Sequence, residues 1–218
     1  MPLNTGKPRR YSKPAISRVG QAGVSLAVVM MILVVVSLLG AGAAQIALMA
    51  ERGARNDRDY QIAWQSADAA LADAEYDIVG GAGVSNNRKN LFAPGERSGF
   101  LTNCGTTGVS KGLCLPAASG NPVWLTASFT SSSSPAVEFG TFTSRAFDAG
   151  SPAAGTVAMV KPVQKPRYLI EVLDDPEVYG DQAVNRRRPP AVVYRVTSMG
   201  FGPRADIQAV LQTLYRKD

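Results

Sequence analysis

The chain has 218 residues, of which 45% are hydrophobic and 18% are charged, so it is too apolar to be disordered and low in charge for a fully soluble protein. It contains no histidine and two cysteines, which excludes Ser-His-Asp and Cys-His catalysis, histidine-bound metals and a four-cysteine zinc site. Anchoring, packing and binding remain, and we expect no enzymatic activity.

The net charge of +6 is concentrated at the N-terminus. Residues 1–23 carry five basic side chains and no acidic one, residues 24–50 carry no charge, and residues 51–78 carry three basic and seven acidic groups. Without its first 23 residues the chain would be nearly neutral. The high pI therefore does not predict binding to nucleic acid.

Residues 24–50 predict a transmembrane helix. Between Arg18 and Glu51 lie 32 uncharged residues, and a helix over 24–50 would reach about 40 Å, enough to span roughly 30 Å of hydrocarbon with some tilt. The apolar run is too long for a cleaved secretory signal. The basic residues before it orient the N-terminus to the cytoplasm, so we expect a single-pass membrane protein whose bulk is exported.

Residues 51–79 predict an amphipathic continuation of that helix, because no proline occurs between 15 and 93. Steps of three and four residues place one set of side chains on an apolar face: Tyr60, Ala63, Trp64, Ala67, Leu71, Ala74 and Ile78. The opposite face carries Gln61, Gln65, Asp68 and Glu75. We expect the apolar face to pack against the head.

The head, residues 80–218, divides by composition. Residues 80–156 are rich in Gly, Ser, Thr, Ala and Pro, and predict loops with short strands at 123–129 and 137–142. Residues 157–218 predict a sheet, with strands at 156–163, 167–173, 192–199 and 207–215 and a turn at 200–206, because apolar residues alternate there. The expected fold class is α+β, with an antiparallel sheet packed on the long helix.

Cys104 and Cys114 enclose nine residues of a Gly-rich loop. In an oxidising, exported compartment this spacing favours a disulfide over two unpaired thiols. Closing a loop of about ten residues would contribute on the order of 2–3 kcal/mol to stability. The spacing does not fit a C-x-x-C redox motif.

Two charged clusters in the head do not predict a site. Arg186, Arg187 and Arg188 precede two prolines, which is typical of a solvated loop. The acidic run at 174–181 lacks the spacing of an EF-hand and reads as an acidic turn. We expect no metal and no cofactor, and what either cluster binds is left open.

Several runs together resemble a known family. The leader ends in Gln21-Ala-Gly23, and an apolar helix opening with VSLAV follows, as in the type IV pilin superfamily. The runs MAERGARNDRD at 49–59 and AWQSADAALADAE at 63–75, with YRVTSMGFG at 194–202 and AVLQTLY at 209–215, more closely resemble PilX-type minor pilins.

This resemblance implies a pilin-like fold, a location in the inner membrane with the head in the periplasm before entry into the pilus, and a processing step. A prepilin peptidase would remove the leader, residues 1–23, by cutting between Gly23 and Val24, and Val24 would become the methylated N-terminus; Gly20 is the competing site. The implied partners are other minor pilins and the major pilin, contacted through the N-terminal helix, and a large tip adhesin. The implied role is pilus assembly, and whether the pilus serves twitching motility, cell adhesion or DNA uptake is left open.

One departure from major pilins concerns Val28. Major pilins carry a glutamate at this fifth mature position, whose carboxylate pairs with the N-terminal ammonium of a neighbour in the apolar filament core. A subunit with Val28 suits a tip or initiation complex better than the repeating shaft. Two alternatives remain open: the tip pseudopilin of a type II secretion system, and a single-pass membrane-anchored protein of another kind.

Overall fold

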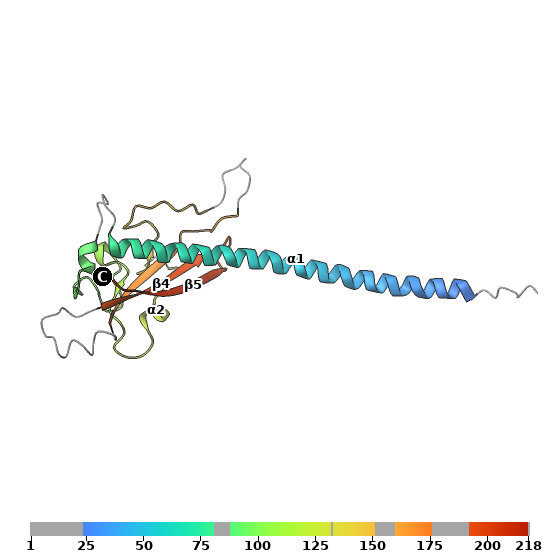
Figure 1. Cartoon of the computed structure of the whole chain (residues 1–218), viewed down its shortest axis with the longest axis horizontal. Helices are drawn as coiled ribbons and strands as arrows, with labels where there is room; N and C mark the ends of the chain where they lie inside the picture. The colour runs from blue at the N-terminus through green and yellow to red at the C-terminus, as the bar shows by residue number, and fades with distance from the viewer. Residues whose placement is uncertain (1–23, 81–87, 132, 151–159, 176–191, 218) are drawn as a thin grey trace, which may run out of the picture. The chain divides into compact units, whose positions relative to one another are not determined.

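The computed structural model describes residues 24–80, 88–131, 133–150, 160–175 and 192–217 (Figure 1). Two compact units divide the chain, one ending at Glu51 and the other beginning at Arg52. The long helix α1 (Val24–Val79) contains this boundary. It stops where Gly80 adopts a φ of 85° and donates a hydrogen bond to the Tyr76 carbonyl, a glycine C-cap.

After α1 come short helical turns and a sheet, which confirms the predicted α+β class. The turns are η1 (Lys89–Phe92), η2 (Gly108–Ser110) and α2 (Val123–Thr126). The strands are β1 (Leu113–Cys114), β2 (Val137–Glu138), β3 (Arg167–Asp174), β4 (Val192–Phe201) and β5 (Gln208–Tyr215).

Among the described residues the sheet has five strands in the order β1-β3-β4-β5, with β2 also paired to β3. The long strands β3, β4 and β5 pair antiparallel, as predicted. The short β1 pairs parallel to β3, and β2 pairs antiparallel near the start of β3. β5 therefore forms one edge of the sheet.

The face of the sheet that packs on α1 carries the larger core. Tyr168, Ile170 and Val172 of β3 point towards the helix, with Tyr194 and Val196 of β4 beside them. The helix contributes small side chains and one larger one to this core: Ala70, Ala74 and Ile78. Burial of a large apolar side chain contributes about 1.5–3 kcal/mol to folding stability. These buried side chains therefore hold the sheet against the helix.

Helix and sheet approach most closely at Gly200. A Cβ on Gly200 would lie 2.1 Å from the Ala67 nitrogen and 2.2 Å from the Ala63 oxygen. Beside it the Ser198 hydroxyl donates a hydrogen bond to the Ala67 carbonyl at 2.8 Å. Only small side chains fit on both elements here.

The opposite face of the sheet is also covered, which the sequence did not predict. Leu169 of β3 packs there with Val123, Phe129 and the two cysteines. On the same face Glu171 is buried and accepts two hydrogen bonds from the Arg195 guanidinium, at 2.8 and 2.9 Å. The covering loops include α2, drawn in yellow-green in Figure 1.

Three predicted strands differ from the structure where it describes them. Residues 123–126 form the helical turn α2, because Pro122 starts it and the N–H groups of Leu125 and Ala127 bond within the turn. The strand at 137–142 ends after Glu138, because Gly140 turns the chain with a φ of 82°. Of the strand predicted at 156–163, residues 156–159 lie outside the described residues, and 160–163 are irregular around Pro162, which has no N–H for a ladder.

The buried face of α1 also differs from the prediction. Tyr60 and Trp64 are exposed, because the close contact at Gly200 leaves no room for aromatic rings. The buried stripe consists mainly of small and acidic residues: Ala63, Ser66, Ala67, Ala70, Asp73, Ala74, Asp77 and Ile78.

Candidate assembly surface

The first half of α1 presents an uninterrupted apolar surface. From Val24 to Met49 every large apolar side chain is exposed, and no charged residue occurs between Val24 and Ala50. Among the described residues, α1 is the one helix long and apolar enough to cross a membrane. An exposed apolar surface of this extent requires lipid or other apolar helices around it.

The residues predicted for processing lie at the start of this surface. Val24 is the first residue of α1 and is exposed, whereas Gly23 lies outside the described residues. Val28 is one turn further along and half exposed, at 50%. This part of the helix therefore presents a methyl-covered surface without a carboxylate.

The head is fastened to the second half of α1 by a buried ion pair. The Arg88 guanidinium donates to both carboxylate oxygens of Asp77, at 2.6 Å for the shortest contact, and the two side chains are 0% and 1% exposed. The Tyr168 hydroxyl of β3 donates to the same carboxylate at 2.8 Å. Burial, together with the negative charge of Asp77, raises the pKa of Tyr168 well above its usual value, so this hydroxyl keeps its proton.

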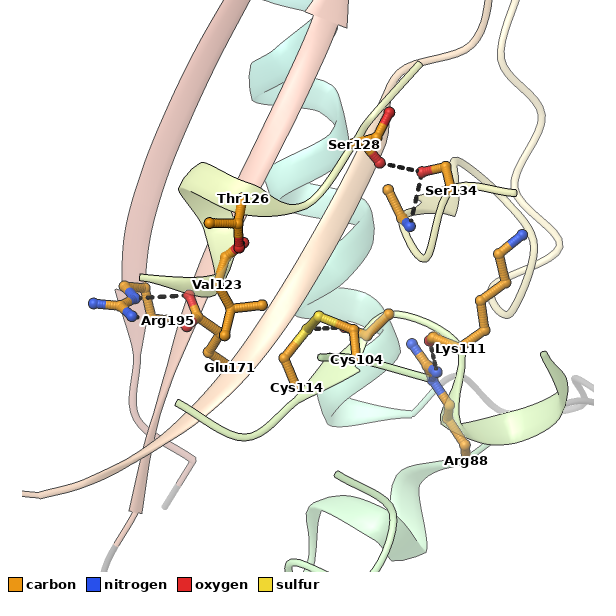
Figure 2. The surroundings of a disulfide bond; sticks show 12 residues. Arg88, Cys104, Lys111, Cys114, Val123, Thr126, Ser128, Ser134, Glu171 and Arg195 are labelled. Carbon is orange, nitrogen blue, oxygen red and sulfur yellow. Dashed lines mark hydrogen bonds and ion pairs between the residues drawn. A yellow bond between two sulfur atoms is a disulfide. The ribbon is translucent and has the colours of Figure 1, made fainter. Parts of the chain in front are cut away.

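Arg88 also holds the disulfide loop. Its Nη1 donates to the backbone carbonyls of Val109 and Lys111, at 2.7 and 2.6 Å. Its guanidinium lies 3.7 Å from the centre of the Phe142 ring, a cation–π contact. Figure 2 shows the bond from Arg88 to Lys111 in the loop closed by the two cysteines. One side chain thus connects helix, loop and core.

The predicted disulfide between Cys104 and Cys114 is present (Figure 2). Cys114 belongs to β1, and the Leu101 and Gly105 N–H groups both bond to the Leu113 carbonyl inside the closed loop. The disulfide therefore connects the loop that covers the outer face of the sheet to β1, which pairs with β3.

A second buried carboxylate, Asp73, holds the segment after β2. It accepts hydrogen bonds from the Gly140 N–H at 2.8 Å and the Thr143 hydroxyl at 2.5 Å, and Arg145 lies 3.6 Å away. Burial raises the pKa of the Asp73 carboxyl above its usual value, although both hydrogen bonds and Arg145 oppose the shift and Asp77 adds to it. Neither Asp73 nor Asp77 was predicted as a buried residue from the sequence, although their four-residue spacing among alanines was the available signal.

The acidic cluster has structural partners at its start. Asp174 pairs with Arg97, and Asp175 pairs with Arg216 at 2.8 Å. Positions 176–191, which include the arginine triplet, lie outside the described residues. No group of three or more potential metal-binding side chains occurs in the part of the chain that the structure describes.

Two family models match the chain. The model described as PilX N-terminal matches residues 22–72, and the model described as type IV pilus assembly protein PilX C-term matches residues 110–217. No curated protein and no solved structure matches significantly. The first match covers the apolar surface and most of the helix that carries the head, and the second covers the whole sheet. The chain belongs to the PilX family of type IV pilus assembly proteins.

Proposed function

We propose that this chain is a minor pilin that acts in a tip or initiation complex of the type IV pilus. The observation that carries the proposal is the first turn of α1, where Val28 replaces the glutamate of major pilins. An N-terminal ammonium buried in an apolar filament without a carboxylate partner is costly. A subunit that cannot supply that carboxylate is poorly suited to a repeating position in the filament shaft. It is better suited to the end of the filament.

The proposed route to this position starts in the inner membrane. The basic leader stays in the cytoplasm and the head lies in the periplasm, as the excess of positive charge before the helix favours. Prepilin peptidase then cuts between Gly23 and Val24, and Val24 is N-methylated. N-terminal mass spectrometry of the protein from its native membrane checks this step: the expected species begins with methylated Val24, and recovery of the intact Met1 form alone would contradict it.

The proposed partners are other minor pilins and the major pilin, which the apolar half of α1 contacts, and a large adhesin at the tip. Association through this surface removes exposed valine, leucine and methionine side chains from lipid and packs them against similar helices. The surface has no charged group between Val24 and Ala50 that would select one helix register. Selection of particular partners then falls to the head.

Deletion of the gene tests the role in assembly. The expected phenotype is a strong fall in the number of pili per cell, with unchanged shaft structure in those that remain, restored by a plasmid copy. A normal number of pili in the deletion strain would contradict the proposal. Pili of altered diameter or helical symmetry would instead indicate a shaft component.

A further inference from the structure

The outer edge of β5 carries backbone groups without partners among the described residues. The Gly202 N–H donates to the Ile207 carbonyl at 2.8 Å, in register with the β4–β5 ladder. Hydrogen-bonded and non-bonded pairs alternate along an antiparallel ladder, so Ala209, Leu211 and Thr213 bond to β4. The N–H and C=O groups of the alternate residues point outward: Gln208, Val210, Gln212 and Leu214.

The sequence of this edge does not protect it from pairing. β5 reads QAVLQTLY, with no charge and no proline over eight residues. Edge strands are normally protected by charges, prolines, bulges or a covering element, because an open edge recruits another strand. On each face of the sheet, a surface beside β5 would contact the side chains of an added strand.

The surface on the outer face of the sheet is apolar. A groove of about 400 Å³ lies between α2 and β5, and Trp124, Leu125, Phe129, Met199 and Val210 are among its lining residues. Leu125 is 59% exposed and Val210 is 48% exposed. Leu214, further along the same face of β5, is 64% exposed. Alternate side chains of an added strand would cover these apolar groups.

The surface on the helix side is acidic. A groove of about 240 Å³ lies between α1 and β5, and its lining includes Asp68, Leu71 and Glu75 of the helix and Thr213 of the strand. Asp68 and Glu75 are exposed, and neither forms an ion pair in the described part of the chain. The lining contains no basic residue to balance these two carboxylates. A lysine or arginine on an added strand would be complementary to them.

We propose that the β5 edge binds an extended segment of another pilus protein as an additional strand of the sheet. The segment has apolar side chains facing the groove beside Leu125 and a basic side chain facing Asp68 and Glu75. Backbone hydrogen bonds supply affinity and the alternate side chains supply selectivity, as in other cases of strand addition. This inference rests on the proposed function, because it requires a partner in the same assembly.

The direction of β5 argues against a second copy of this chain as the added strand. Along α1, Asp59 lies beside Gly202 and Ala67 lies beside Ser198, so β4 runs opposite to the helix. Because β5 is antiparallel to β4, it runs in the same direction as α1, and Lys217, just after β5, reaches Ile78 near the end of the helix. Two-fold pairing of two β5 strands is antiparallel and would reverse one helix relative to the other. Subunits that enter one membrane from the same side keep their helices in the same direction.

Hydrogen exchange of the β5 amides tests the inference. The full chain would be compared alone in detergent and in the complex captured through a tag on this chain from cells that make the remaining pilus proteins. The amides of Val210, Gln212 and Leu214 should exchange rapidly in the isolated chain and at least about tenfold more slowly in the complex. The amides of Leu211 and Thr213, bonded to β4, are the internal control and should be slow in both.

Each outcome has a distinct meaning. Equal, rapid exchange of the outward amides in a complex that contains pilus proteins would overturn the added strand and leave the proposed function standing. Slow exchange already in the isolated chain would overturn it in favour of a second copy or a segment of the same chain. A complex without any pilus protein would contradict the proposed function itself.

A pair of variants gives a second readout. Gln212→Pro removes one outward N–H without removing a bond to β4, whereas Gln212→Ala keeps that N–H and loses the same side-chain bond to Thr197. Loss of one backbone bond to the partner should reduce pilus number roughly threefold to tenfold in the proline variant alone. Val210→Lys, which adds a charge to the edge, should act like the proline variant. Normal pilus number in both, with normal membrane levels, would contradict the inference.

Discussion

The Asp77 carboxylate and the Arg88 guanidinium form an ion pair with a 2.6 Å contact from which solvent is almost completely excluded. The pair joins the last turns of α1 to the segment that begins the head. Because Tyr168 and two loop carbonyls bond to the same two side chains, the interaction is shared by helix, sheet and disulfide loop. The head is thus attached to its helix by a polar network within an apolar core.

Removal of one partner should be costly. Asp77→Ala leaves the Arg88 charge buried without its counter-ion, so we expect a loss of about 3–5 kcal/mol of unfolding free energy. Thermal unfolding of the full chain in detergent measures the change. Glu75→Ala, an exposed carboxylate two residues earlier on the helix, is the matched control and should change stability by less than about 0.5 kcal/mol. Equal effects of the two substitutions would contradict the assigned role of the pair.

Gly200→Ala should disrupt the contact between helix and sheet. The added methyl would lie within 2.2 Å of backbone atoms of Ala63 and Ala67, which cannot move aside as a side chain can. We expect a loss of roughly 3 kcal/mol or failure to fold. Gly53→Ala is the control, because nothing lies within 4 Å of its added Cβ and alanine favours a helix by about 1 kcal/mol. A stable Gly200→Ala protein would show that the two elements are further apart.

Asp73 should make stability fall as the pH rises. Burial raises the pKa of this carboxyl in the folded state above the ordinary value of 3.8, so the folded state holds the proton at a pH where the unfolded state has lost it. The contribution of Asp73 is therefore most favourable below 3.8 and declines as the pH rises through the raised pKa. The difference in melting temperature between wild type and Asp73→Asn isolates this group. The melting temperature of the wild type should fall relative to that of Asp73→Asn as the pH increases. A difference that stays constant, or that changes in favour of the wild type, would contradict the raised pKa of Asp73.

Val28→Glu tests the argument about the missing carboxylate. A glutamate in the lipid-facing helix costs roughly 2–3 kcal/mol unless an ammonium pairs with it. If this subunit has no such neighbour, Val28→Glu should impair assembly to the same extent as Val29→Glu, the adjacent and equally exposed position. The amount of each variant in sheared pili, relative to its amount in the membrane, provides the comparison. Better incorporation of Val28→Glu than of Val29→Glu would reveal a partner ammonium and a position within the shaft.

Long regular patterns made the helix and the three main strands predictable. A run of uncharged residues followed by a proline-free stretch specified α1, and alternating residues such as Tyr168, Ile170 and Val172 specified β3 as a strand. These features depend on neighbours in sequence, which a single chain records directly. The disulfide was predictable for the same reason, since its two cysteines are close in sequence.

The buried face of α1 depends on contacts between distant residues and was not predictable in the same way. Trp64 looked like a core residue by spacing, but Gly200, which read as part of a turn, brings the sheet too close for it. The burial of Asp77 was not predictable either, because its partner, Arg88, follows after the end of the helix. Whether a small or acidic residue on a helix is buried depends on which distant residues pack on it.

The location of the protein in the pilus distinguishes a tip subunit from a shaft subunit. Gold-labelled antibodies against the head, applied to pili still attached to cells and to sheared pili, report the position of each molecule. If the protein is a tip subunit, labels should be few per filament and concentrated at the filament end. Labels spaced evenly along the shaft of wild-type pili would contradict a tip location.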